Sequence, residues 1–274
     1  MANEIQKTTT KAVPSQRMGF TTFMTSSGIS NKVNQIIGDE NRGARFIASI
    51  ISAVNTNPAL KECTNDSILS GALLGESLNL SPSPQLGMYY LVPFNDKDRG
   101  KVATFQLGWK GYYQLALRSG QYKKLNVIEI KEGELIKWDP LEEEISINMI
   151  DDDEIREKTP TIGYYAYYEN LVGFKKCLYW SKAKMEKHAL QYSMGYRAKK
   201  GYTFWEKNFD EMAKKTMLRQ LISKYGVMSI DMQKAYENDM AFIKEDGTQV
   251  YVDNQEDAVI IEPVTTNNVS LDDI

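Results

Sequence analysis

The chain has 274 residues, 42% of them hydrophobic and 25% charged, with a formal net charge of −3, which is ordinary for a soluble globular protein. No apolar run approaches the roughly 20 residues that span a bilayer, and the polar residues 1–15 lack the apolar core of a signal peptide, so we expect no membrane contact. Cys63 and Cys177 are isolated in sequence and are interpreted as buried free thiols of a cytoplasmic protein, not as a metal or redox pair.

The charges are unevenly distributed along the chain. Eight acids and no Lys or Arg follow Lys244, which leaves residues 1–244 with 33 basic and 28 acidic residues. Residues 97–124 carry a local charge of +6 and residues 163–226 of +8, whereas residues 129–160 carry −8. This pattern favours a one-sided basic surface, with chance clustering on a solvated surface as the alternative.

The predicted elements begin after a polar segment. Residues 1–25 are rich in Thr, Ser, Lys and Gln, and we expect most of them to form a mobile tail. Apolar residues at helical spacing predict helices over residues 42–56 and 67–79, the second capped by Asn65 or Asp66.

A β region and a short helix come next. Strands over residues 86–94 and 101–107 flank a turn-rich segment and predict a β-hairpin. A helix over residues 109–119 is expected to follow. Further strands are predicted over residues 125–131, 135–138, 145–148, 162–168 and 173–180, and further helices over residues 182–192, 203–225 and 229–238.

The order of these elements indicates the fold class. Strands cluster between helical segments instead of alternating with them, which favours an α+β fold with an antiparallel sheet and packed helices. We expect the mobile tail over residues 1–25, a folded body over residues 26–244, and an acidic, disordered tail over residues 245–274. The aromatic strands 164–168 and 174–180 are interpreted mainly as sheet face and core, with Lys175 and Lys176 as candidate edge contacts.

Catalytic motifs are absent or isolated in this sequence. It contains no P-loop, so we expect no ATP-driven chemistry. His188 is the single histidine and is interpreted as structural, because no nucleophile or orienting carboxylate recurs beside it. The consecutive acids 151–154 cannot all converge on one ion and are interpreted as a solvated loop, with a two-metal nuclease as the alternative. We expect no catalytic residue and no cofactor, with Mg²⁺ at most as a modulator.

An aromatic and basic block lies at residues 106–113. On the expected helix, Lys110, Gln114 and Arg118 recur every four residues and share one face. Gly111 lies beside them and would let a backbone approach closely. The face is interpreted either as a contact surface for phosphates and base edges or as the solvent-exposed polar face of a helix that covers the sheet.

A second block lies at residues 196–205, followed by a helix with apolar residues on most of its circumference. Lys215 and Arg219 nevertheless share one narrow sector of that helix, and buried cations need partners. Glu211 is one candidate partner of Lys215, and phosphates bound in a groove are the other. We favour phosphates in a groove, because three cations lie just upstream on a glycine-containing loop.

Three stretches are similar to the RecT family of phage and prophage single-strand annealing recombinases. They are SPSPQLGMYYLVPF at residues 81–94, FQLGWKGY at residues 105–112 and AKKTMLRQL at residues 213–221. The similarity covers about residues 17–240 and is closest to prophage members from Gram-positive hosts of the Listeria type. This resemblance implies that the body is a DNA-annealing domain, distantly similar to the eukaryotic Rad-type annealing proteins.

The resemblance implies an ATP-independent protein that binds single-stranded DNA and the annealed duplex intermediate, assembles as a ring or helical filament, and works with a phage exonuclease. A host single-strand-binding protein is a further expected partner. The family's groove residues correspond to Lys110, Arg118, Lys215 and Arg219. With the two blocks, the residues expected to bind DNA are Gln106, Trp109, Lys110, Tyr112, Gln114, Arg118, Arg197, Lys199, Lys200, Tyr202, Lys215 and Arg219.

The resulting hypothesis is a DNA groove between the helix that begins at Trp109 and the helix that begins at Thr203. Lys97, Arg99 and Lys101 at the hairpin tip are interpreted as a clamp over that groove or over a neighbouring subunit. The alternative function is a passive single-stranded DNA-binding protein that protects DNA without annealing it.

Overall fold

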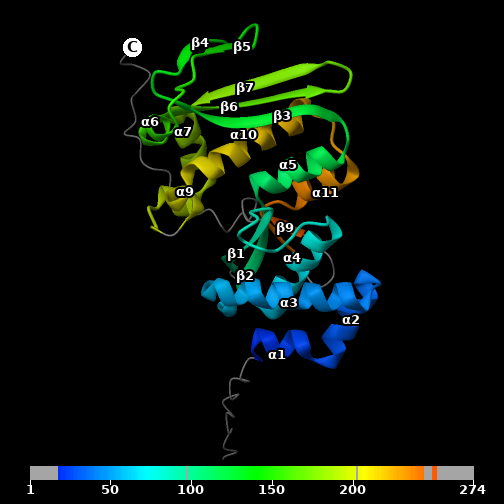
Figure 1. Ribbon diagram of the computed structural model, residues 1–274. Helices are drawn as coiled ribbons and strands as arrows, with labels where there is room; N and C mark the ends of the chain where they lie inside the picture. Colours follow the sequence, from blue (N-terminus) through cyan, green and yellow to red (C-terminus); the bar gives the residue numbers. More distant parts are fainter. Residues whose placement is uncertain (1–17, 97, 202, 244–248, 252–274) are drawn as a thin grey trace, which may run out of the picture. The chain divides into compact units, whose positions relative to one another are not determined.

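The computed structural model describes residues 18–96, 98–201, 203–243 and 249–251 (Figure 1). It combines helices with small antiparallel sheets, so the predicted α+β class is confirmed. The chain divides into two compact units, Met1–Ile51 and Ser52–Ile274. Cys63 and Cys177 are buried free thiols, as the sequence indicated.

The first unit contains α1 (Phe20–Thr25), α2 (Ser27–Ile37) and the start of α3 (Glu40–Thr56). A Cβ on Gly43 would lie 2.0 Å from Oδ1 of Asn34, so this glycine lets α3 approach α2. Helix α3 was predicted within two residues of its start. Helix α2 was not predicted, and α1 lies at the end of the segment expected to be a tail.

A four-stranded sheet is built on the predicted β-hairpin. Strands β1 (Tyr89–Asp96) and β2 (Gly100–Leu107) pair from Tyr89 with Leu107 to Asp96 with Gly100. Strand β8 (Ala241–Ile243) pairs with β2, and β9 (Gln249–Tyr251) pairs with β8. Residues 249–251 therefore belong to a sheet, although the sequence placed them in the acidic tail; the rest of residues 245–274 lies outside the described residues.

Two helical segments precede this sheet. The 3-10 helix η1 (Pro58–Glu62) leads to α4 (Asn65–Ser77), which packs on β2. The N-cap of α4 is Thr64, so the prediction of Asn65 or Asp66 as the cap was wrong. A Cβ on Gly75 would lie 2.4 Å from the Tyr89 ring, which shows how closely α4 approaches β1.

A second sheet contains β3 (Tyr122–Lys131), β6 (Thr161–Asn170) and β7 (Lys175–Ser181), all antiparallel. Tyr164 and Tyr168 of β6 are buried, so the structural interpretation of the aromatic strands is confirmed for them. Strands β4 (Leu135–Asp139) and β5 (Glu144–Ile147) form a separate hairpin. Figure 1 shows α10 (Phe209–Tyr225) running along this sheet, and α10 contacts all three of its strands.

The helix predicted over residues 203–225 is broken. Helix α9 (Phe204–Lys207) begins at a capping box formed by Thr203 and Glu206. Asn208, with φ −139° and ψ 56°, interrupts the helical backbone before α10 begins. Periodicity alone could not show this break, because the apolar spacing continues across it.

The remaining helices lie close to their predicted positions or were missed because they are short. Helix α5 (Trp109–Arg118) connects β2 to β3, and α7 (Lys182–Tyr192) follows β7. Helix α11 (Ile230–Asn238) precedes β8. The short helices α6 (Asp153–Lys158) and α8 (Met194–Arg197) were not predicted. Asp152 of the acidic run caps α6 by accepting a hydrogen bond from the backbone N–H of Ile155.

Candidate nucleic-acid interface

The first aromatic–basic block meets the helix that follows the second block at Trp109, where α5 packs against α10. The indole N–H of Trp109 donates a hydrogen bond to Glu211. The ammonium of Lys214 lies 5.2 Å from the Trp109 ring centroid, and that of Lys110 lies 5.8 Å from it. Both distances are within cation–π range, so the ring holds two positive charges beside it.

Helix α9 joins this region through an aromatic contact. Phe204 lies with its ring centroid 5.4 Å from that of Tyr90 in β1. Beside Tyr90, a Cβ on Gly87 would lie 3.4 Å from Cδ of Lys110. The start of α5, the start of β1 and the end of the second block are therefore neighbours.

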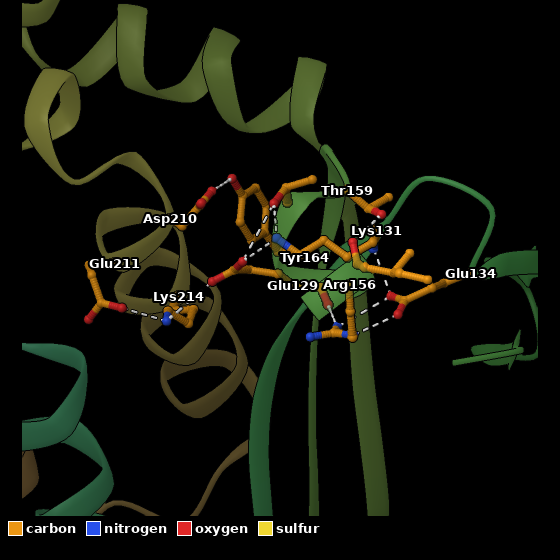
Figure 2. A network of polar contacts seen from close by, with 11 residues as sticks. Glu129, Lys131, Glu134, Arg156, Thr159, Tyr164, Asp210, Glu211 and Lys214 are labelled. Atoms are coloured by element: carbon orange, nitrogen blue, oxygen red, sulfur yellow. Dashed lines mark hydrogen bonds and ion pairs between the residues drawn. The ribbon is translucent and has the colours of Figure 1, made fainter. Parts of the chain in front are cut away.

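Lys214 belongs to a network of charges that links α10 to the sheet of β3, β6 and β7 (Figure 2). Its ammonium lies 2.5 Å from Glu211 and 3.4 Å from Glu129. Glu129 lies in turn 2.9 Å from Lys131, whose ammonium donates to Thr161 at 2.9 Å. These contacts hold the Lys214 side chain, which is 15% exposed, against β3.

Neighbouring pairs in Figure 2 extend this network. The buried carboxylate of Glu134 accepts a hydrogen bond from Arg156 at 2.6 Å, and Arg156 also donates to the Glu129 carbonyl at 2.8 Å. The hydroxyl of Tyr164 donates to Asp210 in the first turn of α10 at 2.5 Å. Helix α10 is therefore tied to β6 through Asp210 and to β3 through Lys214.

Pairing dominates the electrostatics of this network. Burial opposes the ionised form of Glu129, but Lys131 and Lys214 outweigh it and lower the pKa of Glu129. Burial also opposes the charge of Lys214, yet its contacts with Glu211 and Glu129 raise the pKa of Lys214 above its usual value. Both groups are charged at neutral pH.

A second network is centred on Asp239, whose side chain is fully buried. One carboxylate oxygen accepts from the backbone N–H of Leu107 and from Lys215, each at 2.9 Å. The other accepts from the Tyr112 hydroxyl at 3.2 Å and from Arg219 at 2.5 Å. Asp239 therefore joins the end of β2, α5 and α10 at the point where the chain leaves α11.

Burial and charge set the protonation states around Asp239. Burial raises the pKa of Tyr112 well above its ordinary value, and the negative charge of Asp239 adds to the rise. Burial opposes the charge of Arg219, but Tyr112 and Asp239 more than offset it, so the pKa of Arg219 is raised. The Arg219 guanidinium also lies 4.3 Å from the Tyr236 ring centroid.

These contacts place two predicted DNA-binding residues in the interior. Tyr112 is 2% exposed and Lys215 is 7% exposed. The Tyr112 ring has no free face for a base, and the ion pair formed by Lys215 is with Asp239. The sequence suggested Glu211 as a partner of Lys215. In the structure Glu211 pairs with Lys214, and Lys215 pairs with Asp239.

The exposed members of the predicted set lie around these networks. Lys110, Lys199 and Lys200 are exposed, and Lys199 has a left-handed backbone with φ 49°. Arg197 is half-buried, and its Nη2 atom is buried without a hydrogen-bond partner among the described residues. Tyr202 lies outside the described residues.

Three further predicted residues have mixed surroundings. Gln106, in β2, and Gln114, in α5, are half-buried. Arg118 is exposed, but its guanidinium donates to the carbonyls of Leu78 at 3.0 Å and Asn79 at 3.4 Å, just after α4. Arg118 therefore already serves to hold α5 against the end of α4.

The sequence suggested that Gly111 lets another backbone approach closely. In the structure the backbone that approaches is that of Met88 in the same chain. A Cβ at this position would lie 2.1 Å from the Met88 carbonyl oxygen. At the predicted hairpin clamp, Lys101 pairs with Glu62 and Lys97 lies outside the described residues. The structure shows that α5 and α10 pack directly against each other. The DNA groove expected between them stays a prediction.

Sequence reasoning missed Glu129, Lys214 and Asp239 as site residues. Lys214 lies beside Lys215, and a basic pair on a helix gives no signal of which cation faces inward. Asp239 is 24 residues from Lys215 and 132 from Leu107, so only the tertiary structure brings them together.

His188 is part of an aromatic cluster, in line with its structural interpretation. Its ring centroid lies 4.6 Å from that of Tyr192 and 5.5 Å from that of Trp180. Burial lowers the pKa of His188, and the positive charge of Arg219 lowers it further. Among the described residues, no three His, Cys, Asp or Glu side chains are grouped to hold a metal ion, and no helix is long and apolar enough to cross a membrane.

Comparisons with known proteins agree with the resemblance found in the sequence. A sequence profile described as "RecT family" matches residues 44–254. The chain is 41% identical to the uncharacterized protein YqaK of Bacillus subtilis (strain 168) over 253 residues, which are 92% of this chain and 81% of that protein. It is 29% identical to Protein RecT of Escherichia coli (strain K12) over 198 residues, 71% of this chain and 70% of that protein.

The fold and the site define an α+β protein that gathers aromatic and basic side chains from two distant segments around α5, α9 and α10. The chain belongs to the RecT family, whose members anneal single strands of DNA in recombination. The sequence suggested a particular similarity to Listeria-type members of the family. The two relatives come from Bacillus subtilis and Escherichia coli, and they do not point to Listeria in particular.

Proposed function

We propose that this protein binds single-stranded DNA and anneals it to a complementary strand without ATP. The gathering of cations from α5 and α10 at Trp109, with Phe204 of the second block on the neighbouring Tyr90, is the observation that carries this proposal. Family membership supports the annealing step in particular, because a basic surface by itself is equally suited to passive binding.

Annealing demands that phosphates be neutralised while the pairing edges of the bases stay free. The exposed cations Lys110, Lys199 and Lys200 suit the first requirement. Trp109 is already flanked by the ammoniums of Lys110 and Lys214, which favours a role in holding cations near phosphates over a role in stacking. Such a surface grips the backbone and leaves bases accessible.

Lys215 and Arg219 contribute to this surface through a different geometry. Both are bound to Asp239, and the Arg219 side chain is 30% exposed against 8% for Lys215. We therefore propose Arg219 as the member of this pair that reaches DNA. We propose that Lys215, buried beneath this surface, adds to its positive potential and holds α10 in place through Asp239.

The proposal extends to assembly and partners. We infer a cytoplasmic homo-oligomer, ring or filament, in which neighbouring subunits continue the DNA path and each binds a few nucleotides. A phage exonuclease would supply the single strand, and a host single-strand-binding protein would meet the protein on DNA. No nucleotide or metal cofactor is proposed, and Mg²⁺ would act at most as a modulator.

The experiment that tests the function mixes complementary fluorescent oligonucleotides with the protein in the absence of nucleotide. Accelerated pairing supports annealing. Protection of the strands without acceleration would show a passive binding protein, and Mg²⁺-dependent shortening of the strands would show a nuclease.

Single substitutions then test the surface. Lys110→Ala should weaken binding to single-stranded DNA and reduce the slope of log affinity against log salt by about 0.7, the value for one phosphate contact. Lys158→Ala, an exposed lysine of α6 in the acidic segment, is the matched control and should leave both unchanged. Equal behaviour of the two variants would contradict the proposed surface.

A further inference from the structure

We propose that the indole N–H of Trp109 and the ammonium of Lys214 form a subsite for one backbone phosphate of single-stranded DNA, and that the carboxylate of Glu211 occupies this subsite when DNA is absent. The inference rests on the proposed function, since it names the part of the surface where one phosphate binds. It adds Glu211 and Lys214, which the sequence did not assign to DNA binding.

The contacts of Glu211 define the subsite. One carboxylate oxygen accepts the hydrogen bond from the Trp109 indole, and the other lies 2.5 Å from the Lys214 ammonium. A phosphodiester presents the same pattern, because two non-bridging oxygens on one atom share a negative charge. The Glu211 carboxylate thus satisfies the two donors that a phosphate would use.

The two donors are held independently of Glu211. Lys214 has Glu129 of β3 as a second partner at 3.4 Å, and its side chain is only 15% exposed. Trp109 is the first residue of α5, which packs on α10. The donors should therefore remain in place when the Glu211 side chain leaves.

Glu211 is more exposed to solvent than the other acid that pairs with Lys214. Its side chain is 50% exposed, in contrast to the 21% of Glu129. Solvent at the Glu211 carboxylate screens its attraction to Lys214 and so weakens the ion pair. A phosphate that also gains the exposed ammonium of Lys110, which lies over the same indole ring, can displace it.

Glu211 would therefore lower the affinity for DNA, because it occupies both donors when DNA is absent. A purely structural Glu211 would instead only anchor the indole ring. The two roles are separated by Glu211→Gln, because the amide oxygen still accepts the indole hydrogen bond but the negative charge is gone.

The test measures binding of a fluorescently labelled oligothymidylate by anisotropy across a range of KCl concentrations. We expect Glu211→Gln to bind about two- to fivefold more tightly at low salt, the equivalent of one exposed ion pair. The slope of log affinity against log salt should steepen by up to about 0.7, the value for one phosphate contact, because no freed Glu211 carboxylate then takes up a cation when DNA binds. Glu157→Gln, at an exposed position of α6, changes the net charge equally and serves as the control.

A second variant removes the proposed phosphate ligand. Lys214→Gln should weaken binding, and the gain from Glu211→Gln should disappear in the double variant, with thermal unfolding used to confirm that each protein is folded. If Glu211→Gln matches Glu157→Gln or binds more weakly, the subsite is wrong even though wild-type protein binds and anneals. If wild-type protein binds no single-stranded DNA, the proposed function itself fails.

Discussion

At the scale of single residues, the decisive finding concerns charge pairing. Lys215 and Arg219 lie in the stretch that resembles the RecT family, and both point to one fully buried carboxylate, Asp239. Asp239 also accepts from the Leu107 backbone and from Tyr112. One acid therefore satisfies donors from three elements, and its loss would remove the carboxylate that Lys215 and Arg219 share.

We predict that Asp239→Ala destabilises the protein by about 3–5 kcal/mol, the cost of leaving a buried charge without its partner. Urea unfolding monitored by circular dichroism measures this difference. Glu237→Ala, at an exposed position of α11, should change the free energy of unfolding by less than about 0.5 kcal/mol.

A compensating variant keeps this prediction testable where Asp239→Ala does not fold. Asp239→Asn combined with Lys215→Met removes one cation together with the carboxylate and should recover part of the lost stability. Asp239→Ala and Glu237→Ala with the same urea midpoint would show that the network is not stabilising.

At the scale of elements, the position of α5 depends on a close approach of two backbones. The N–H of Gly108 donates to the Met88 carbonyl at 2.9 Å, and a Cβ on Gly111 would lie 2.1 Å from that same oxygen. A carbonyl cannot move away as a flexible side chain can. Gly111 is therefore required where α5 starts, the same turn that presents Trp109 and Lys110.

We predict that Gly111→Ala costs about 1–3 kcal/mol, because the added methyl group pushes α5 away from the carbonyl of Met88, the residue before β1. The same change at Gly28, a helical position in α2 with nothing within 4 Å of an added Cβ, should be neutral or stabilising by up to about 1 kcal/mol. Thermal unfolding of both variants measures the contrast. An unchanged melting temperature for Gly111→Ala would mean that α5 tolerates displacement.

At the scale of the whole molecule, charge is segregated along the chain. Residues 1–244 are net basic, with 33 basic and 28 acidic residues, while residues 252–274 carry six acids and no Lys or Arg. Acidic segments on the same chain compete with DNA for basic surfaces, and this competition weakens when salt screens it.

We predict that a chain ending at Tyr251, which keeps β9, binds single-stranded DNA a few-fold more tightly at low salt than the full chain. The difference should vanish near 0.5 M salt, where screening reaches only about 4 Å. A full-length variant with the six acids changed to their amides controls for length and should behave like the shortened chain. Unchanged affinity of both at low salt would contradict this competition.

The sequence by itself determined the fold class, the β-hairpin and the main helices, because hydrophobic periodicity is local. Helix α7 was predicted with both of its bounds, and α5 was predicted to begin at Trp109, as it does. The family also followed from local motifs. Short strands such as β8 escaped prediction because three residues carry no periodicity and need a partner strand.

Only the tertiary structure decided which cations face inward. Lys214 and Lys215 are adjacent in sequence, yet one pairs with Glu211 and Glu129 beside Trp109, and the other pairs with Asp239 in the interior. Their partners lie far away along the chain for the most part, and the energy of a charge depends on burial and on the nearest opposite charge. Sequence patterns report neither quantity.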